Sequence, residues 1–397
     1  MPDEGTPLLM RVTMVNKYYP PHLGGIEFHM RDLATALVAR GHSVRALVAN
    51  EGREAVAEMV DGVEVVRLRR AFAYASTPVA FGMRTAIARE AVRTDPPDLF
   101  HLHFPYPWGE VSWLAAGGGR GASSGGRPKS TIPTVLAYHS DVVRQKALLA
   151  LYAPILRRVL DRVDVVFASS PNMVEHSPFL SQIPDKCRVI PYGIHVERYA
   201  DTPELTARAA ALRAGHDRPI VLFVGRLVYY KGPEVLVRAM ADVDADLVVI
   251  GRGPLKPELE ALAASSGIAS RVTFLDPVDD DELAAWYHAA DIFCLPSVAR
   301  SEAYGLVQLE AHASGTPTIS TTLTTSVPFV NADGVTGLTV PPGDVPALAE
   351  ALRALVDDES LRTRLGAQAR ERARAEFSID RMVDQTLQAY AELGVNV

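Results

Sequence analysis

Residues 219–240 read PIVLFVGRLVYYKGPEVLVRAM, and this stretch decides the fold class. The apolar run Pro219–Val224 predicts a buried parallel strand, and Pro233–Met240 predicts the helix that follows it. A short loop joins them and contains Gly225, Arg226, Lys231 and Gly232. A buried strand followed by a helix is the repeating unit of α/β proteins, so the same alternation is expected on either side.

That alternation continues outward in both directions. After this stretch, strands are expected at 246–250, 272–275, 292–295 and 318–320, and helices at 257–265, 280–289, 305–313, 345–357 and 360–376. Before it, strands are expected at 11–15, 43–48, 62–68, 98–103, 134–138, 163–169 and 188–190, and a helix at 27–40. Two successive runs of this kind predict two doubly wound α/β domains.

The length of 397 residues also fits two domains. The polar segment Tyr199–His216 is placed as the linker, which gives a first domain at 1–198 and a second at 199–378. Residues 379–397 are expected to form a helix that packs back on the first domain. Residues 115–130 (AAGGGRGASSGGRPKS) contain little to bury and are predicted to form a flexible surface loop.

Composition excludes several classes of protein. Hydrophobic residues make up 48% and charged residues 22%, and the formal net charge is -7, which argues against a general nucleic-acid binder. The two cysteines, Cys187 and Cys294, are too few for a disulfide scaffold and indicate a reducing cytoplasm. The first residues show no signal-peptide pattern, and no apolar run approaches the ~18 residues of a spanning helix. A protein in the cytoplasm is expected, with peripheral contact at the inner face of the plasma membrane left open.

Two loops are candidate anion sites. Gly24 and Gly25 lie between the first strand and the first helix, where two glycines let backbone N–H groups approach an anion. The dinucleotide fingerprint is absent, because Met30 stands where its third glycine would be. Arg226 and Lys231 follow the first strand of the second domain, at the sheet edge where open α/β sheets bind ligands. One guanidinium and one ammonium suit a diphosphate.

Carboxylates near a helix start form a second pattern. Gly305 would begin a helix, Glu302 lies in the preceding loop, and Glu310 lies further along the helix. Carboxylates beside an anion site suit the hydroxyls of ribose and hexose rather than the phosphate. His139 ends a strand of the first domain and is expected to face the crevice between the domains.

Hydrolytic and metal sites are not predicted. Ser140 and Asp141 lack a G-x-S-x-G elbow. The acidic run 242–246 precedes its strand and so lies at the wrong sheet edge, and no partner ligands are evident for His101 and His103 at metal spacing.

Taken together, these residues resemble family four of the retaining glycosyltransferases, which have the two-domain GT-B fold. The matching residues are Gly24-Gly25 with Glu27, His139, Gly225-Arg226, Lys231-Gly232, the segment Glu302–Glu310, Gly315-Thr316-Pro317, Gly334–Leu338 and Pro341–Asp344. The matches run in order over nearly the whole chain. The resemblance implies two Rossmann-like domains that face each other across a cleft.

The resemblance also implies roles for individual residues. The catalytic residues would be Arg226, Lys231, Glu302 and His139. The donor-binding residues would be Gly24, Gly25, Arg226, Lys231, Gly251, Arg252, Val278, Glu302, Tyr304, Gly305, Leu306, Val307 and Glu310. Arg226 and Lys231 would bind the donor diphosphate, Glu302 the hydroxyls of the transferred sugar, and Glu310 the ribose. No metal and no cofactor beyond the nucleotide-sugar substrate are implied.

The expected reaction moves a hexose from a nucleotide sugar to a hydroxyl of a glycan, glycolipid or small-molecule acceptor, with retention at the anomeric carbon. Ser326–Val330 and Gln308 resemble bacterial mannosyl- or rhamnosyltransferases, which favours GDP-mannose as donor. A UDP-hexose donor and a GT-B sugar-nucleotide 2-epimerase remain alternatives. The apolar segment Leu148–Val163 carries three arginines and would either dock on anionic lipid or pack on the sheet.

Overall fold

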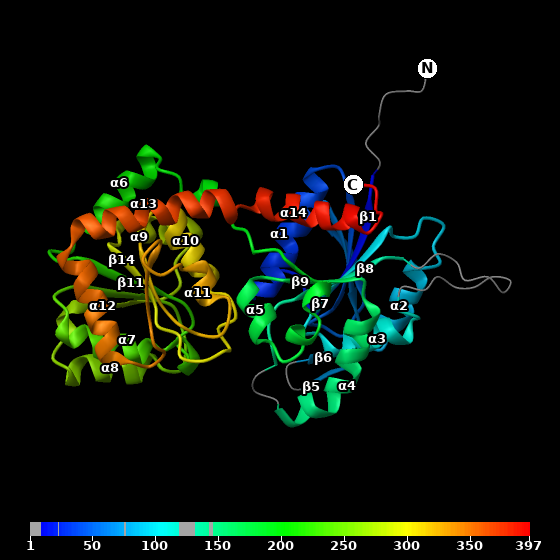
Figure 1. Ribbon diagram of the computed structural model, residues 1–397, viewed down its shortest axis with the longest axis horizontal. Helices are drawn as coiled ribbons and strands as arrows, with labels where there is room; N and C mark the ends of the chain where they lie inside the picture. The colour runs from blue at the N-terminus through cyan, green and yellow to red at the C-terminus, as the bar shows by residue number, and fades with distance from the viewer. Residues whose placement is uncertain (1–8, 23, 75–76, 119–131, 143–145) are drawn as a thin grey trace, which may run out of the picture. The chain divides into compact units, whose positions relative to one another are not determined.

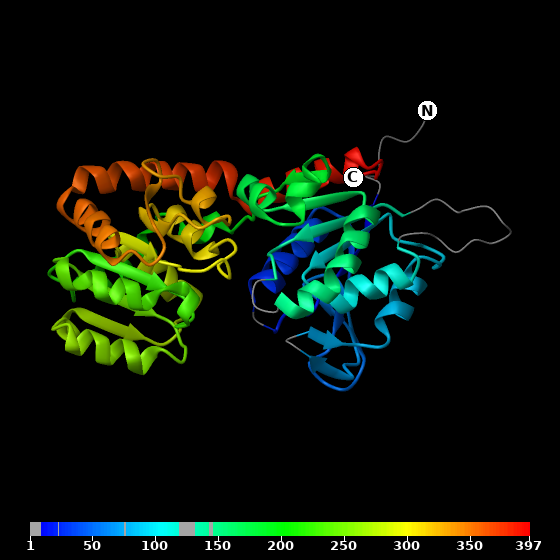
Figure 2. The ribbon, with the colours of Figure 1, turned by 60° about the horizontal axis from the view of Figure 1, so that its bottom comes forward.

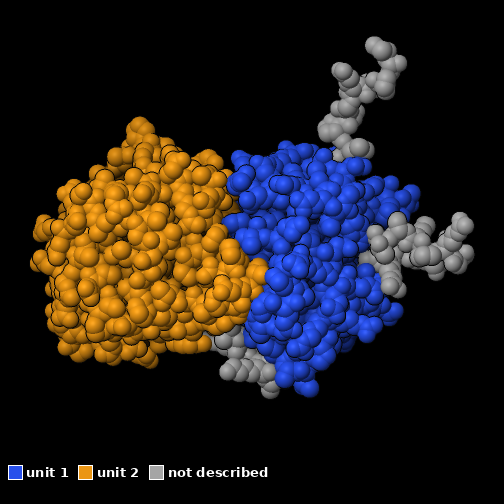
Figure 3. Space-filling model, in the orientation of Figure 1, with its two compact units in different colours: residues 1–169, 177–191, 379–397 blue, residues 170–176, 192–378 orange. Residues whose placement is uncertain are grey.

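The computed structural model describes residues 9–22, 24–74, 77–118, 132–142 and 146–397 (Figure 1). It divides the chain into two compact units (Figure 3). Unit 1 contains residues 1–169, 177–191 and 379–397, and unit 2 contains residues 170–176 and 192–378. Most of the loop predicted at 115–130 lies outside the described residues.

The boundary between the units differs from the predicted linker at 199–216. The chain passes into unit 2 at residue 192, and the short helix α5 (Pro171–His176) also belongs to unit 2. The predicted linker is instead a packed helix, α6 (Pro203–Arg213), whose Leu205 is buried against Ala284 and Ala285. Ala209 of this helix is also buried, and Leu212 packs beside Leu205.

Unit 1 is built on an eight-stranded sheet in the order β10-β9-β8-β7-β1-β2-β4-β3. Its strands are β1 (Arg11–Val15), β2 (Ser43–Ala49), β3 (Val56–Val60), β4 (Val63–Leu68), β7 (Leu99–Phe104), β8 (Thr134–Tyr138), β9 (Val165–Ala168) and β10 (Cys187–Val189). The pairings are parallel, except that β3 runs antiparallel to β4. Strands β5 (Phe72–Tyr74) and β6 (Thr77–Val79) form a separate hairpin.

Helices cover both faces of this sheet. Helix α1 (Gly25–Ala39) and the C-terminal helix α14 (Ile379–Glu392) lie side by side on one face, and their apolar residues join one core with the strands (Figure 1). Arg40 binds Asp384 and Asp380 of α14, which confirms the expected packing of the C-terminal segment. Helix α2 (Met83–Glu90) lies on the opposite face, followed in the chain by α3 (Pro107–Ala115) and α4 (Lys146–Arg162).

Unit 2 is built on a six-stranded parallel sheet in the order β13-β12-β11-β14-β15-β16. Its strands are β11 (Ile220–Val224), β12 (Asp246–Ile250), β13 (Val272–Leu275), β14 (Ile292–Leu295), β15 (Thr318–Thr321) and β16 (Gly337–Val340). Its longer helices are α7 (Pro233–Ala239), α8 (Lys256–Ser265), α9 (Asp280–Ala289), α10 (Leu306–Ser314), α12 (Val345–Asp357) and α13 (Glu359–Glu376). This is the Rossmann strand order, and its direction reverses between β11 and β14.

The predicted strands and helices are confirmed to within about two residues at their ends. The sequence analysis missed β3, β5, β6 and β16. Both cysteines are unpaired, and Cys294 is buried in β14. Among the described helices, none has the length and apolar character needed to span a membrane.

Candidate active site

The candidate site in unit 2 lies at the reversal point of its sheet. β11 and β14 are neighbours, and the loops that follow them carry the predicted residues: Lys231 lies after β11 and Glu302 after β14. Loops that leave a reversal point diverge to opposite faces of the sheet, which leaves a crevice at the carboxyl ends of the strands. The topology therefore brings together residues 71 positions apart.

Lys231 and Glu302 form an ion pair at this edge. The Lys231 Nζ lies 2.6 Å from Glu302 Oε2, and the two side chains are only 12% and 11% exposed. The Ser297 hydroxyl donates to the same carboxylate oxygen at 3.4 Å. Taking two charges out of water is costly, and each charge here depends on the other for compensation. A bound anion would give the ammonium a second partner.

Backbone packing fixes the position of this ammonium. The Lys231 side chain passes directly over Gly225, where a Cβ would lie 3.1–3.4 Å from Cδ, Cε and Nζ of the lysine. The Gly251 backbone in turn touches the Gly225 carbonyl so closely that no Cβ would fit. The ends of β11 and β12 thus form a flat backbone surface beside the ammonium.

Arg226 belongs to the same group but is exposed. Its guanidinium donates to the Tyr230 hydroxyl at 2.7 Å, and its Cζ lies 6.0 Å from the centre of that ring. The Lys231 ammonium lies 5.9 Å from the same ring. The two predicted cations therefore flank one aromatic side chain, and the exposed arginine can move toward a ligand at little cost.

A helix N-terminus follows the same loop. Gly305 caps α10 with a φ of 76°, a left-handed conformation that favours glycine, and a Cβ there would lie 2.6 Å from Leu295. The first N–H groups of α10, including those of Leu306 and Val307, have no acceptor within the helix. Such groups favour an anion.

The Tyr304 side chain is engaged within unit 2. The side chain is buried, and its hydroxyl accepts from the Tyr192 N–H at 3.1 Å and lies 3.3 Å from the Tyr192 carbonyl.

Glu310 lies further along α10 and accepts a hydrogen bond from the Tyr287 hydroxyl at 2.7 Å. Burial raises the pKa of this carboxyl above its usual value. Arg252 and Val278, predicted to flank the base, follow β12 and β13. Arg252 binds Asp276 at 3.3 Å, and Val278 packs on the core.

In unit 1, the glycine pair begins α1 as predicted. Gly24 is the N-cap and Gly25 the first helical residue, exposed and with no atom near the position of a Cβ. The Glu27 carboxylate folds back over Gly24 and is buried. Leu23 lies outside the described residues.

His139 lies in a cluster of buried histidines that the sequence did not reveal. His103 Nδ1 lies 2.9 Å from His139 Nε2, and His101 Nδ1 lies 2.7 Å from the Tyr390 hydroxyl. The His29 ring contacts the His139 ring edge-on at 5.1 Å. The strands place this cluster at the carboxyl ends of β7 and β8, on the face that α1 and α14 cover.

Burial keeps the cluster neutral. It lowers the pKa of His29 to about 4 and that of His101 to about 3. It also lowers the pKa of both His103 and His139 well below the usual value. These side chains are therefore uncharged near pH 7.

Nitrogen atoms of His29, His103 and His139 lie within 4.8 Å of one another, the spacing of a metal-binding group. The prediction that His103 has no partner ligands at metal spacing is thus wrong, because His29 and His139 lie at that spacing. The His103 and His139 rings are within 8° of parallel with centres 5.2 Å apart, so the hydrogen bond runs in the ring planes. This bond engages one nitrogen of each of the two rings.

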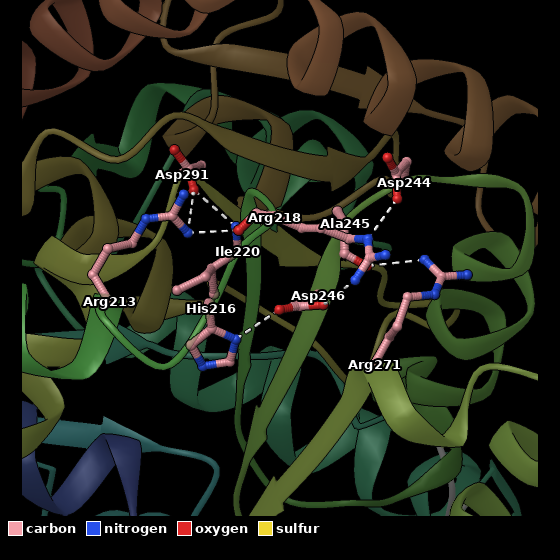
Figure 4. A network of polar contacts seen from close by, with 9 residues as sticks. All are labelled: Arg213, His216, Arg218, Ile220, Asp244, Ala245, Asp246, Arg271 and Asp291. Carbon is pink, nitrogen blue, oxygen red and sulfur yellow. Dashed lines mark hydrogen bonds and ion pairs between the residues drawn. The ribbon is translucent and has the colours of Figure 1, made fainter.

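The acidic run 242–246 is at the amino ends of the strands, as predicted. Asp244 binds Arg218 at 2.7 Å, and Asp246 binds His216 at 2.8 Å (Figure 4). Asp291 accepts from the Ile220 N–H in the same network. These acids stabilise the edge of the sheet opposite to Lys231.

Sequence reasoning missed the side chains that hold the predicted residues in place. Tyr230, Ser297 and Tyr287 contact Arg226, Glu302 and Glu310 respectively. Tyr230 could have been found from the sequence, because it lies next to Lys231 in the loop that was already predicted to bind the donor. Ser297 and Tyr287 come from other elements and only the fold brings them in.

Comparisons with known proteins agree with this arrangement. Residues 23–198 match the model "Glycosyltransferase Family 4" and residues 207–372 match "Glycosyl transferases group 1". The chain is 34% identical over 385 residues to the O-antigen chain mannosyltransferase C of Escherichia coli, covering 97% of this chain and 99% of that one. It is 32% identical over 370 residues to the D-rhamnosyltransferase WbpZ of Pseudomonas aeruginosa, covering 93% and 92%.

Solved structures show the same fold. Sucrose-phosphate synthase from Thermosynechococcus elongatus superposes with a TM-score of 0.76 at 24% identity, covering 97% of this chain and 99% of that one. Anabaena Alr3699/HepE in complex with UDP-glucose superposes with a TM-score of 0.74 at 16% identity, covering 96% and 100%. With two Rossmann-like units and these family matches, the chain belongs to glycosyltransferase family 4 and has the GT-B fold.

Proposed function

We propose that this glycosyltransferase transfers mannose from GDP-mannose to a hydroxyl of a glycan, glycolipid or small-molecule acceptor, with retention and without a metal ion. The observation that carries the proposal is the Lys231–Glu302 pair, 2.6 Å apart at the carboxyl ends of β11 and β14. It places a cation for phosphate beside a carboxylate for sugar hydroxyls. The names of the two bacterial relatives support mannose or a closely related hexose.

The donor diphosphate would lie at the start of α10. Lys231 is paired with Glu302 in the loop before α10, the N–H groups of Leu306 and Val307 begin that helix, and the exposed Arg226 could turn toward the diphosphate. The ribose hydroxyls would be bound by Glu310, whose carboxylate Tyr287 holds in place. Gly251, Arg252 and Val278 would flank the base.

Catalysis would come from stabilising the leaving group. When the sugar–phosphate bond breaks, negative charge grows on the departing diphosphate, and fixed cations and N–H groups stabilise that charge more than the ground state. These side chains supply the positive charge that a divalent metal supplies elsewhere, which supports a reaction without metal. Activity that persists in the presence of EDTA is the expected result.

Retention would follow from attack on the same face that the diphosphate leaves. Glu302 is engaged with Lys231 and Ser297, so it is not placed as a covalent nucleophile. A phosphate oxygen of the leaving group would then accept the acceptor's proton. NMR of the product tests this, because an inverted anomer would contradict it.

The alternative to a guanosine donor is a uridine donor. The Anabaena structures, crystallised with UDP and UDP-glucose, favour uridine as an alternative. A thermal-shift screen separates the two, because a ligand that binds the native state raises the melting temperature by mass action. Stabilisation by GDP and not by UDP is expected, and the reverse result would replace the donor by a UDP-hexose.

We place the reaction in the cytoplasm, where nucleotide sugars serve as donors, and include a peripheral contact with the inner face of the plasma membrane. A glycolipid acceptor would require such contact.

A further inference from the structure

A buried glutamine lies in the first turn of α10, where the donor diphosphate is proposed to bind. Gln308 is the third residue of this helix, and it is completely buried. The helix packs beside α13 within unit 2 (Figures 1 and 2). Amide side chains are seldom buried completely, because their polar atoms need hydrogen-bond partners. The contacts of Gln308 therefore show which part of the site it holds.

The Gln308 amide donates to two backbone carbonyls just before the helix. Its Nε2 atom lies 3.2 Å from the Tyr304 carbonyl oxygen and 3.4 Å from that of Gly305. The Gly305 carbonyl also accepts from the Gln308 backbone N–H at 2.9 Å. Two acceptors beside one amide atom require that atom to be the nitrogen, because an oxygen there would repel both. Gln308 thus fixes two successive peptide groups.

These hydrogen bonds set the direction of the neighbouring N–H groups. In a trans peptide, the carbonyl and the N–H of one peptide group point in opposite directions. Because the Tyr304 carbonyl faces Gln308, the Gly305 N–H faces away from it. The same holds for the Gly305 carbonyl and the Leu306 N–H. Gln308 therefore turns two N–H groups away from its own buried position.

This arrangement differs from the usual capping box. There the third residue of a helix accepts a hydrogen bond from the N-cap N–H with its side-chain oxygen. Here Gly305 is the N-cap, and Gln308 presents its amide nitrogen instead, so its side chain does not use the Gly305 N–H. The N–H group that a capping box would satisfy within the protein is left for a ligand.

Gly305 and Gln308 also fit each other sterically. A Cβ at Gly305 would lie 2.8 Å from Gln308 Nε2 and 2.6 Å from Leu295. The residue before Tyr304 is held independently, because the Ser326 N–H donates to the Ala303 carbonyl at 2.9 Å. The peptide groups that follow Tyr304 and Gly305 are the ones that depend on Gln308 for their orientation.

Stability alone does not account for an amide at this position. Among the residues that the structure describes, none donates a hydrogen bond to the Gln308 Oε1 atom, although that atom is buried. A buried acceptor without a partner lowers the stability of the fold, and a methionine of similar length would avoid that cost. What the amide adds is the orientation of its neighbours.

We infer that Gln308 is a positioning residue for the donor diphosphate, and that it directs the Gly305 and Leu306 N–H groups at the departing phosphate without touching the ligand. The inference rests on the proposed function, which places the diphosphate at the start of α10. Fixed N–H groups stabilise the charge that grows on a leaving group, because they need not reorient as the bond breaks. Without Gln308, the same groups bind the anion less tightly.

Isothermal titration calorimetry of the full chain with GDP and UDP tests the inference. Gln308→Met removes the amide donor and keeps the length of the side chain. It should weaken binding of the diphosphate about tenfold, the loss expected for one hydrogen bond to a charged group. The melting temperature should stay close to that of wild type, because the unpaired Oε1 atom is removed together with the donor.

Gln308→Glu is the second variant. A protonated carboxyl can donate to a carbonyl as the amide does, whereas a carboxylate can only accept and would repel both carbonyls. Burial should keep this carboxyl protonated to a higher pH than usual, so diphosphate binding should approach that of wild type at about pH 5.5 and weaken by about pH 8. Each value is compared with wild type at the same pH. Gln308→Met should bind weakly at both.

Gln385→Met in α14 is the matched control. The Gln385 Oε1 atom is likewise buried without a partner among the described residues, but it lies in unit 1, so diphosphate binding should not change. Recovery of binding by Gln308→Glu at acid pH would support the inference even if Gln308→Met failed to fold.

Two results would overturn the inference and leave the proposed function standing. One is diphosphate binding by Gln308→Met that equals that of wild type. The other is a Gln308→Met chain that does not fold together with weak binding by Gln308→Glu at every pH, which would assign Gln308 a structural role alone. A wild-type chain that binds neither GDP nor UDP would overturn the inference and the proposed function together.

Discussion

Both units bury polar side chains at the carboxyl ends of their strands, but those of unit 2 form an ion pair whereas those of unit 1 are neutral. Unit 2 buries a charged pair, Lys231 and Glu302, whereas unit 1 buries a neutral cluster around His103 and His139. A charged pair can exchange one partner for a charged ligand. A neutral cluster offers hydrogen bonds and shape but no countercharge. The anionic part of a ligand is therefore expected on unit 2.

The largest effect is expected from breaking the charged pair. Lys231→Met should lower kcat about 10³-fold, because it removes a cation aimed at the leaving diphosphate. It should also lower the free energy of unfolding by about 3–5 kcal/mol, because Glu302 is left as an uncompensated buried charge. Single-turnover transfer assays and urea unfolding measure the two effects.

A second variant separates these two effects. Lys231→Met combined with Glu302→Gln removes both charges and should recover most of the lost stability without recovering activity. Recovered activity in the double variant would remove Lys231 from the chemistry and leave it a structural role.

The histidine cluster of unit 1 should make the stability of that unit depend on pH. The folded-state pKa of each clustered histidine lies below its unfolded value, so the unfolded state binds more protons between about pH 4 and 6.5. Stability conferred by the cluster is therefore complete above pH 6.5 and is lost as the pH falls. Unit 2 buries one comparable histidine, His312. Unit 1 should therefore lose more of its stability than unit 2 as the pH falls from 6.5 to 5.

Hydrogen exchange measured by mass spectrometry follows the two units in one sample. Peptides from β7 and β8 should lose protection at a higher pH than peptides from β11 and β14. Equal loss in both units would mean that the clustered histidines are already protonated in the native state.

One buried acid in unit 1 should act in the opposite direction. Burial raises the pKa of Glu110 to about 8, so the native state keeps a proton that the unfolded state releases above about pH 4.5. This contribution to stability falls as the pH rises through that window. Glu110→Gln should remove it, leaving the variant about 3 kcal/mol more stable relative to wild type at pH 8 than at pH 5. Urea unfolding at both pH values measures this, and parallel profiles would show that Glu110 is ionised when folded.

The smallest effect concerns the exposed cation. Tyr230→Phe removes the hydroxyl that accepts from Arg226 but keeps the ring beside Lys231. A donor KM raised about two- to fivefold with kcat unchanged is expected, since exposed hydrogen bonds contribute about 1 kcal/mol or less. A kcat lowered at saturating donor would instead place Tyr230 in the transition state.

Most of the fold could be predicted because buried parallel strands are short apolar runs. β3 was missed because Val56–Val60 is an exposed edge strand with no apolar run, and β5 and β6 are too short to carry a pattern. The linker was misplaced because the apolar residues of α6 are mostly alanines and do not gather on one face, so the sequence pattern does not show that Leu205 and Ala209 are buried.

Some contacts of the candidate site could be predicted from the sequence and others could not. Lys231 and Glu302 follow strand ends, so strand order alone brings them together. The contact between His103 and His139 depends instead on the register of β7 with β8, and that with His29 depends on how α1 lies on the sheet. Neither is encoded by spacing along the chain.

Isothermal titration calorimetry of nucleoside mono- and diphosphates tests the central claim most directly, in the guanosine and uridine series alike. With whichever base binds, the wild-type chain should bind the diphosphate more tightly than the monophosphate, and Lys231→Met combined with Glu302→Gln should abolish that difference. A double variant that keeps the full preference for the diphosphate would contradict the assignment of Lys231 as its ligand.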